Sequence, residues 1–312
     1  MQTLPSSLRI GVLRGGPSSE YDVSMKSGEN ILKQLSETHR PVDIFISKDK
    51  KWHVQGLERS PERILKNVDV VFNALHGEYG EDGQVQDILD HHGVPYTGSL
   101  RYPSSIAMNK WLSKEKVMKE GIKTPVSVLF RPTEFLTERA REISGAITFP
   151  MVVKPVKGGS SIGITIVQNE AQLITALQTS LINKEDMLVE ECIKGKEATC
   201  GVVDGLRDQP LYALPSIEVI SKQNREVCPG NFSQAEKKEL ERLSKLVHQT
   251  LGLRHYSRSD FIVSPRRGIY FLEVNTLPGL TKESLLPKSL EAVGISTKDF
   301  LHHVLSLALN RK

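Results

Sequence analysis

The sequence predicts an α/β protein: a parallel-sheet domain at the N-terminus, followed by a mixed part with antiparallel strands. Short apolar runs alternate with helical patterns over the first hundred residues, which is typical of parallel strands with crossover helices. Beyond that point, glycine-rich turns join apolar runs at short spacing, as in antiparallel hairpins. A chain of 312 residues exceeds one typical core, so we expect two or three domains.

The N-terminal elements follow a strand–helix order. A strand at 8–14 ends at Gly15-Gly16-Pro17, and a helix follows in which Val23 and Leu35 belong to an apolar stripe at helical spacing. Further strands are expected at 42–46, 68–75 and 94–98, with helices at 61–67 and 83–93. The first domain should end near residue 100.

The rest of the chain contains shorter strands and four helical patterns. Ser233 and Glu236 form a capping-box pattern that predicts the start of a helix over 233–251. The other helices are expected at 102–120, 169–181 and 297–309, and the strands at 126–130, 151–155, 164–167, 187–193 and 197–203.

Composition excludes several classes of protein. The 41 basic and 37 acidic residues are interspersed, so no basic arm indicates nucleic-acid binding. No apolar run approaches a membrane span, and the N-terminus lacks a signal-peptide pattern. Cys192, Cys200 and Cys228 lack metal-ligand spacing, which favours free thiols in a reducing compartment. We therefore expect a cytoplasmic protein.

Residues 260–285 form the most informative segment, and the first part of it predicts a pair of strands. The runs FIV and IYFLEV flank SPRRG, which predicts a β-hairpin. Glu273 and Asn275 lie two residues apart and share one face of a strand, and Asp260 begins the opposite strand at about the same height. These hard oxygen ligands suit Mg²⁺, whose other positions are commonly filled by water and phosphate. The alternative is a hairpin whose acids face solvent.

A glycine-rich turn offers a place for phosphate. KGGSSIG (157–163) lies between two predicted strands and presents backbone N–H groups and hydroxyls. Lys154, on the preceding strand, can reach the same phosphates. A flexible linker is the alternative reading of such a turn.

Other polar residues stand at the ends of predicted strands. Glu20 follows a Gly-Gly turn that does not fit the G-x-G-x-x-G pattern, so a nicotinamide cofactor is not favoured. Glu20 can receive a ligand ammonium or simply favour a helix start. His76 opens HGEYGEDG at the carboxyl edge of the sheet. Glu190 and Glu197 flank a segment able to meet a nucleotide, although each is also typical of a strand-end surface residue.

The order of these motifs resembles the D-alanine–D-alanine ligases of the ATP-grasp superfamily over residues 8–307. EVNTLPGLTKESL (273–285) and HGEYGEDG (76–83) are its most specific parts. The resemblance implies a Rossmann-like domain at 1–100 and a two-lobed ATP-grasp domain, with a central lobe at 101–185 and a metal-binding lobe at 186–312. It also implies ATP as co-substrate, two Mg²⁺ or Mn²⁺ ions, small-molecule substrates and a homodimer.

The resemblance also assigns residue roles. The nucleotide would be held by Lys110, Lys154, Ser160, Ser161, Glu190, Ile193 and Glu197. The metal ligands would be Asp260, Glu273 and Asn275. Glu20 would take the ammonium of the first D-alanine, with Ser160 in its hydrogen-bond network and His76 nearby. Arg258 and the N–H of Gly279 would form the oxyanion site, and Ser284 and Leu285 would contact the carboxylate of the second amino acid.

The expected reaction joins two D-alanines through an acyl phosphate, to supply D-alanyl-D-alanine for peptidoglycan. One segment departs from the family pattern: only SKQNREV (221–227) stands where relatives usually have a longer loop with a tyrosine and a lysine. Glu283 also replaces a histidine found in many relatives. A different acceptor such as D-lactate or D-serine therefore stays open, as does a catalytically silent ATP-binding protein.

Overall fold

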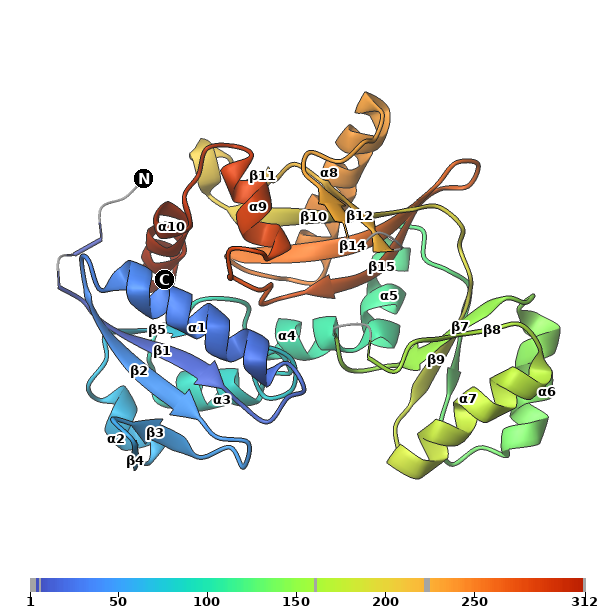
Figure 1. The fold of residues 1–312 in the computed structure, drawn as a ribbon, viewed down its shortest axis with the longest axis horizontal. Helices are drawn as coiled ribbons and strands as arrows, with labels where there is room; N and C mark the ends of the chain where they lie inside the picture. The colour runs from blue at the N-terminus through green and yellow to red at the C-terminus, as the bar shows by residue number, and fades with distance from the viewer. Residues whose placement is uncertain (1–3, 6, 160–161, 222–224, 311–312) are drawn as a thin grey trace.

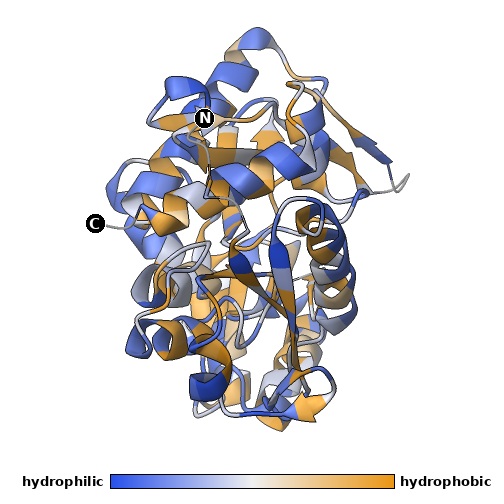
Figure 2. Ribbon diagram, turned by 90° about the vertical axis from the view of Figure 1, so that its left-hand side faces the viewer, coloured by the Kyte–Doolittle hydropathy of each residue, from blue (hydrophilic) through white to orange (hydrophobic). Residues whose placement is uncertain are grey.

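Three β-sheets organise the chain, and a computed structural model describes residues 4–5, 7–159, 162–221 and 225–310 (Figure 1). The sheets contain five, six and four strands. Apolar residues gather on the strands and on the inward helix faces, as the orange segments in Figure 2 show. The α/β fold class expected from the sequence is therefore confirmed.

The N-terminal sheet has a parallel centre. Its order is β4-β3-β2-β1-β5, and β1 pairs in parallel with β2 and with β5. The strands are β1 (Arg9–Gly15), β2 (Arg40–Ile46), β3 (Trp52–Val54), β4 (Leu57–Glu58) and β5 (Val70–Asn73). The antiparallel β3–β4 extension was not predicted. The strand expected at 94–98 is only an isolated bridge from Tyr96 to Val71.

Helices from both ends of the chain cover this sheet. They are α1 (Tyr21–Leu35), α2 (Pro61–Leu65), α3 (Gln84–His91) and α10 (Thr297–Leu309). Helix α10 lies beside α1 in Figure 1, and Phe300 and Val304 share one buried cluster with Ile10 and Phe72. Val23, expected on the apolar stripe of α1, is 39% exposed and borders a cavity instead. The last helix therefore fastens the C-terminal part to the first sheet.

Two short helices lead to the four-stranded sheet. The helix expected over 102–120 is broken at Asn109 into α4 (Arg101–Met108) and α5 (Lys110–Lys119). The Asn109 side chain accepts a hydrogen bond from Leu112 N and so caps α5.

The four-stranded sheet has the order β6-β9-β7-β8. Its elements are β6 (Ser127–Phe130), α6 (Leu136–Ala146), β7 (Met151–Pro155), β8 (Thr165–Val167), α7 (Glu170–Asn183) and β9 (Met187–Glu191). Strand β9 pairs with β6 and β7, so it belongs to this sheet although it follows the boundary expected at residue 185.

The six-stranded sheet carries the predicted hairpin. Its elements are β10 (Lys196–Asp204), η1 (Leu206–Asp208), β11 (Leu211–Ala213), β12 (Ile217–Ile220), β13 (Arg225–Val227), α8 (Gln234–Thr250), β14 (Tyr256–Ser264), β15 (Gly268–Asn275) and α9 (Leu285–Glu291). The capping box at Ser233 is confirmed. Asp260 does not begin its strand: β14 starts at Tyr256, because pairing with β10 extends it upstream.

None of the described helices combines the length and apolar character needed to cross a membrane. The three cysteines are free thiols, and Cys200 is fully buried in the core under α8.

Candidate active site

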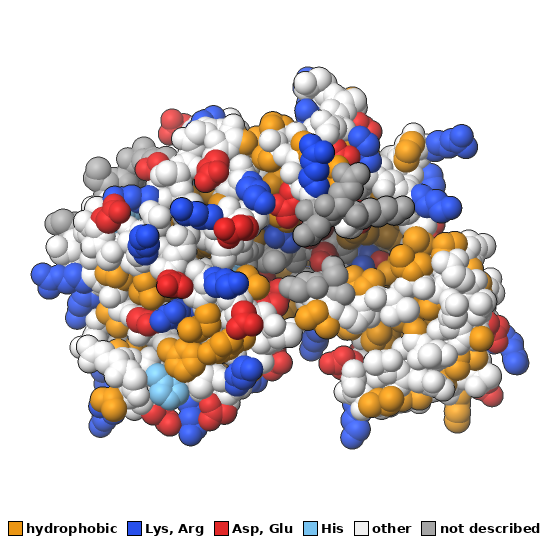
Figure 3. All heavy atoms as spheres, in the orientation of Figure 1, with side chains coloured by type: hydrophobic (Ala, Val, Ile, Leu, Met, Phe, Trp, Pro, Cys, Tyr) orange, Lys and Arg blue, Asp and Glu red, His pale blue; other side chains and the backbone are white. Residues whose placement is uncertain are grey.

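Two cavities meet where the three sheets approach one another. The larger, about 600 Å³, includes Lys154, Glu190, Ile193, Glu197 and Asp260 in its lining. The smaller, about 250 Å³, includes Glu20, His76, Arg258, Gly279 and Ser284. Glu273 and Leu285 line both. Figure 3 shows the surface hollowed between the N-terminal part at lower left and the four-stranded-sheet part at lower right.

The expected metal ligands share one face of the β14–β15 hairpin. Asp260 and Glu273 are directly paired in the register, and Arg258 is paired with Asn275. A register shift between Asp260 and Phe261 bends the strand at this point. Among the residues that the structure describes, no three His, Cys, Asp or Glu side chains form a metal cluster. Two carboxylates and one amide fit Mg²⁺ in a partial site that phosphate oxygens and waters complete.

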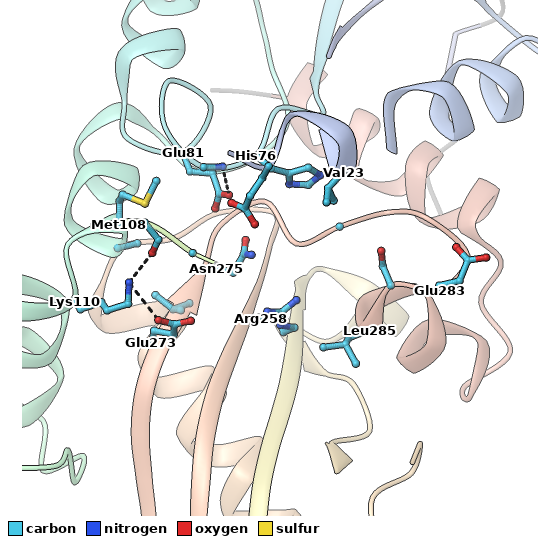
Figure 4. Close-up of a pocket in the computed structure, with 18 of the residues that line it drawn as sticks. Val23, His76, Glu81, Met108, Lys110, Arg258, Glu273, Asn275, Glu283 and Leu285 are labelled. Atoms are coloured by element: carbon cyan, nitrogen blue, oxygen red, sulfur yellow. Dashed lines mark hydrogen bonds and ion pairs between the residues drawn. The ribbon is translucent and has the colours of Figure 1, made fainter. Parts of the chain in front are cut away.

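Lys110 approaches this hairpin from the first residue of α5. Its ammonium donates to Gly158 O at 2.6 Å and lies 3.4 Å from Glu273 Oε2, as the dashed lines in Figure 4 show. The Lys110 side chain is 7% exposed. The contact with Gly158 ties Lys110 to the glycine-rich turn. The neighbouring Ser160 and Ser161 lie outside the described residues.

A buried ion cluster stands at the back of the larger cavity. Glu190, on β9, pairs with Lys154 on β7 at 2.8 Å and also with Lys114 on α5. Burial raises the pKa of Glu190, but the two ammonium groups outweigh it, so the pKa lies below its usual value. Burial lowers the pKa of Lys114 to about 7. The sequence reasoning missed Lys114, although it lies one helical turn after Lys110.

The outer part of the larger cavity combines apolar and polar walls. Ile164, Ile166, Ile193 and Leu272 supply apolar surface, which suits a planar ring. Glu197, at the start of β10, accepts a hydrogen bond from Ser221 Oγ at 2.7 Å. The sequence-predicted positions Lys154, Glu190, Ile193 and Glu197 are therefore brought together in one cavity.

Glu20 and His76 stand on the N-terminal side of the smaller cavity. A Cβ at Gly77 would lie 2.9 Å from Glu20 Oε2 and 2.6 Å from Ser18 Oγ, so only glycine fits beside this carboxylate. His76 lies between Ser27 Oγ (3.1 Å from Nε2) and Leu277 O (2.7 Å from Nδ1). Burial lowers the pKa of His76 and favours the neutral ring.

Arg258 and Gly279 stand on the opposite side. The Arg258 guanidinium donates to both oxygens of Asp260 at 3.2 Å. Burial lowers the pKa of Arg258, but Asp260 outweighs it and raises the pKa above its ordinary value. Figure 4 shows Arg258 and Asn275 on adjacent strands, both facing the cavity. Among the described residues the N–H of Gly279 has no hydrogen-bond partner, which leaves a donor available to a ligand.

The far end of the smaller cavity is built from the start of α9 and from β13. Ser284 Oγ lies 2.8 Å from Thr281 Oγ1, and Leu285 begins α9. Glu226, on β13, pairs with Lys288 on α9 at 2.5 Å. The short segment at 221–227 thus ends in a strand paired with β12 and fastened to α9; residues 222–224 lie outside the described part.

Glu81 is a second residue that the sequence reasoning missed. It is 6% exposed, faces the smaller cavity from HGEYGEDG, and hydrogen-bonds to residues that follow β15. His76 can be recognised in this motif because it follows a strand end, but a loop acid gives no sequence signal of a partner almost 200 residues away.

Comparisons with known proteins place the chain in a family. Residues 9–64 and 55–99 match the model of the D-ala D-ala ligase N-terminus, and residues 117–306 match that of the C-terminus. The D-alanine--D-alanine ligase of Syntrophotalea carbinolica is 36% identical, with 97% of each chain covered.

Solved structures agree with this match. The D-alanine--D-Alanine ligase of Bacillus anthracis complexed with ATP is 33% identical with a TM-score of 0.82, and 97% of each chain is covered. The VanG D-Ala:D-Ser ligase of Enterococcus faecalis is 27% identical with a TM-score of 0.86, covering 97% of this chain and 99% of its own. The chain therefore belongs to the D-alanine–D-alanine ligase family.

Proposed function

We propose that the protein is an ATP-dependent ligase that joins two D-alanines to give D-alanyl-D-alanine for peptidoglycan precursors. One observation carries the proposal: Glu273 lines both cavities, so the wall between a nucleotide-sized space and a small-substrate space contains a metal-type carboxylate. A phosphoryl group can pass only where two such spaces meet. Family membership and the ATP complex of the Bacillus anthracis relative support ATP as the co-substrate.

In this proposal, the larger cavity binds ATP. Ile193 and the apolar wall take the adenine, Glu197 accepts from the ribose hydroxyls, and Lys110 and Lys154 reach the phosphates as point charges. Glu190, held ionised by Lys114, fixes the position of Lys154. Asp260, Glu273 and Asn275 would hold two Mg²⁺ or Mn²⁺ ions, which when bound offset charge on the transferring phosphoryl group. We also propose that Ser160 and Ser161 contact the phosphates.

The first D-alanine binds with its ammonium near Glu20, where the carboxylate lies beside Gly77 and Gly159. Its carboxylate oxygen attacks the γ-phosphorus of ATP, ADP leaves, and an acyl phosphate forms. This activation is needed because a free carboxylate is a poor acyl donor. Water has to be kept away from this intermediate, because it would hydrolyse the acyl phosphate.

The second amino acid enters near the start of α9, with its carboxylate against Ser284 and Leu285. Its amine attacks the acyl carbon, and the tetrahedral oxyanion accepts hydrogen bonds from Arg258 and from the N–H of Gly279. Phosphate then leaves as the amide forms. Arg258 already lies 3.2 Å from Asp260, so it is preorganised at the junction of the two cavities.

The alternative to a second D-alanine is a different second substrate, and one structural observation is a reason to test it. Strand β13 and its Glu226–Lys288 pair lie in the segment where the family resemblance leads us to expect a longer loop. VanG of Enterococcus faecalis, a D-Ala:D-Ser ligase with a similar fold, gives D-serine as one such acceptor. D-Lactate is another.

We further propose a cytoplasmic homodimer with only small-molecule partners, and three domains. The sheet membership of β9 supports placing the second domain boundary after Glu191 instead of at 185.

Incubation with ATP, Mg²⁺ and D-alanine tests the function. We expect equal amounts of ADP and dipeptide. Absence of ADP release across a panel of D-amino and D-hydroxy acids would contradict the proposal and favour a silent ATP-binding protein.

A further inference from the structure

The five residues that follow β15, here called the 276–280 loop, rest on the N-terminal part of the chain. Their backbone groups bond to side chains from α1 and from HGEYGEDG, over separations of about 200 residues or more. The loop continues directly from Asn275 and contains Gly279. Its position is therefore determined by a part of the chain distant from the strand that carries it.

Glu81 accepts several of these hydrogen bonds with a single carboxylate. Its Oε2 accepts from Thr276 N at 3.1 Å, Thr276 Oγ1 at 3.0 Å and Leu277 N at 3.1 Å. Its Oε1 accepts from Gly77 N at 2.9 Å. Four donors to one carboxylate, all buried, hold the first two loop residues against the turn that borders Glu20 and His76.

Ser27 and His76 hold the other end. Ser27 Oγ accepts from Leu280 N at 3.2 Å, so its own proton points to His76 Nε2. Nε2 must then be the acceptor, and the proton of the neutral ring sits on Nδ1, which donates to Leu277 O at 2.7 Å. Asn30 Nδ2 donates to Leu280 O at 2.7 Å.

These contacts leave one backbone donor of the loop uncommitted. The N–H groups of Thr276, Leu277 and Leu280 are bonded, and proline at position 278 has none. Within the described structure, the N–H of Thr281 bonds to Ser284 Oγ, while that of Gly279 has no acceptor. Gly279 also lines the smaller cavity.

We propose that Glu81 is a positioning residue for acyl transfer: it fixes the 276–280 loop, with Ser27 and His76 at the far end, so that the Gly279 N–H points at the developing oxyanion. The inference rests on the proposed function, because it assigns the use of that N–H. Both ring nitrogens of His76 are already hydrogen-bonded, to Ser27 Oγ and to Leu277 O. The imidazole therefore holds the loop in place and does not carry a proton in the reaction.

If Glu81 had a purely structural role, its substitution would lower the stability of the protein without slowing one particular step of the reaction. A positioning role predicts a loss of kcat and of coupling, because an oxyanion donor acts in the transition state and not in ATP binding. A misplaced donor slows amide formation, and the acyl phosphate is then lost to water. Dipeptide per ADP should fall below one.

The test uses Glu81→Ala, Glu81→Gln and Ser27→Ala, with Asp82→Ala as matched control. Asp82 lies in the same turn and accepts from Tyr79 N, Gln84 N and Gln84 Nε2, all within the N-terminal part. Gln at position 81 can still accept from the three loop donors through its amide oxygen, and its NH2 group loses only the hydrogen bond that Gly77 N donates. It is therefore the conservative variant and also the fallback if Glu81→Ala does not fold.

We expect Glu81→Ala to lower kcat by about 100-fold, with the KM for ATP changed less than about threefold and dipeptide per ADP below one. Glu81→Gln should recover most of kcat, and Asp82→Ala should keep the coupling ratio of the wild type. Equal losses in Glu81→Ala and Asp82→Ala, or full coupling in Glu81→Ala, would overturn the positioning role.

Hydrogen exchange separates this inference from the proposed function. The Thr276 and Leu280 amides should exchange faster in Glu81→Ala and Ser27→Ala, respectively, and not in Asp82→Ala. If the wild type releases no ADP, the proposed function is wrong, and so is the role of the Gly279 N–H as an oxyanion donor. If the enzyme is active but amide exchange is unchanged in the variants, only the positioning role of Glu81 is wrong.

Discussion

The guanidinium of Arg258 forms two hydrogen bonds of 3.2 Å with the carboxylate of Asp260, two residues along the same strand. Asp260 in turn faces Glu273 in the register, and Glu273 lies 3.4 Å from Lys110. Asp260 and Glu273, the two acids proposed as metal ligands, thus each have a cationic neighbour. Arg258 is proposed to bind the oxyanion, and Lys110 is proposed to bind phosphate. The two functions share one small network of charges at the junction of the cavities.

Arg258→Ala should lower kcat for dipeptide formation by about 100- to 1,000-fold, since it removes an oxyanion donor. Arg258→Lys should recover little, because lysine cannot keep the paired contact to Asp260. Steady-state ADP release and dipeptide yield measure both. Arg242→Ala, which removes an exposed ion pair with Glu239, is the control and should leave kcat unchanged. Wild-type kcat in Arg258→Ala would remove Arg258 from the oxyanion site.

Glu273→Gln should abolish turnover while the fold is retained, because an amide is a weaker Mg²⁺ ligand than a carboxylate. The residual ADP release should be below about 1% of the wild-type rate. Circular dichroism and the melting temperature check the fold, and Glu239→Gln serves as the surface control. Undiminished activity at any Mg²⁺ concentration would refute the metal assignment.

Cys192 provides a probe of the nucleotide site, because it is half-buried in the lining of the larger cavity. Cys200 is fully buried and burial raises its pKa to about 12, so it should not react. In a Cys228→Ser background, saturating ATP should slow maleimide labelling of Cys192 by at least about tenfold through direct coverage. D-Alanine alone should not. Peptide mass spectrometry gives the rate, and equal labelling with and without ATP would argue against nucleotide in that cavity.

Glu81 should make stability depend on pH. Burial raises its pKa to about 7, against hydrogen bonds that favour the charged form. Because the folded pKa is raised, the stabilisation is complete below about pH 4.5 and is lost as the pH rises through 7. The gap of about 2.5 pKa units corresponds to about 3 kcal/mol. Glu20, which faces Glu81, contributes to the raised value.

Urea denaturation at pH 4.5 and 7.5 measures this effect. Between these values the unfolding free energy of the wild type should fall relative to Glu81→Gln by about 3 kcal/mol. A difference between the two proteins that does not vary with pH would show that Glu81 is ionised throughout this range.

The sequence predicted the elements with strong local signals. The parallel strands β1, β2 and β5 follow from apolar runs and turns, and the start of α8 follows from the Ser233–Glu236 box. The facing of Asp260 and Glu273 follows from strand periodicity and a short turn. In each case the information lies within a few residues.

What the sequence did not predict depends on distant partners. The segment expected as a strand at 94–98 lies beside β5 and forms only one bridge with it, from Tyr96 to Val71. Lys114 on α5 meets Glu190 on β9, and Glu81 meets Thr276, only through the tertiary fold. Strand β13 has no strand signal of its own in the sequence, and it forms because residues 225–227 pair with β12.

In the proposed reaction, the junction at Glu273 joins a D-alanine, activated by ATP, to an amine acceptor. Its most direct test is mass-spectrometric identification of the product from ATP, Mg²⁺ and an equimolar mixture of D-alanine, D-serine and D-lactate. We expect D-alanyl-D-alanine as the main product, in equal amount to ADP, as the proposed reaction requires. A product lacking D-alanine at its first position, or ADP release without any condensed product, would contradict it.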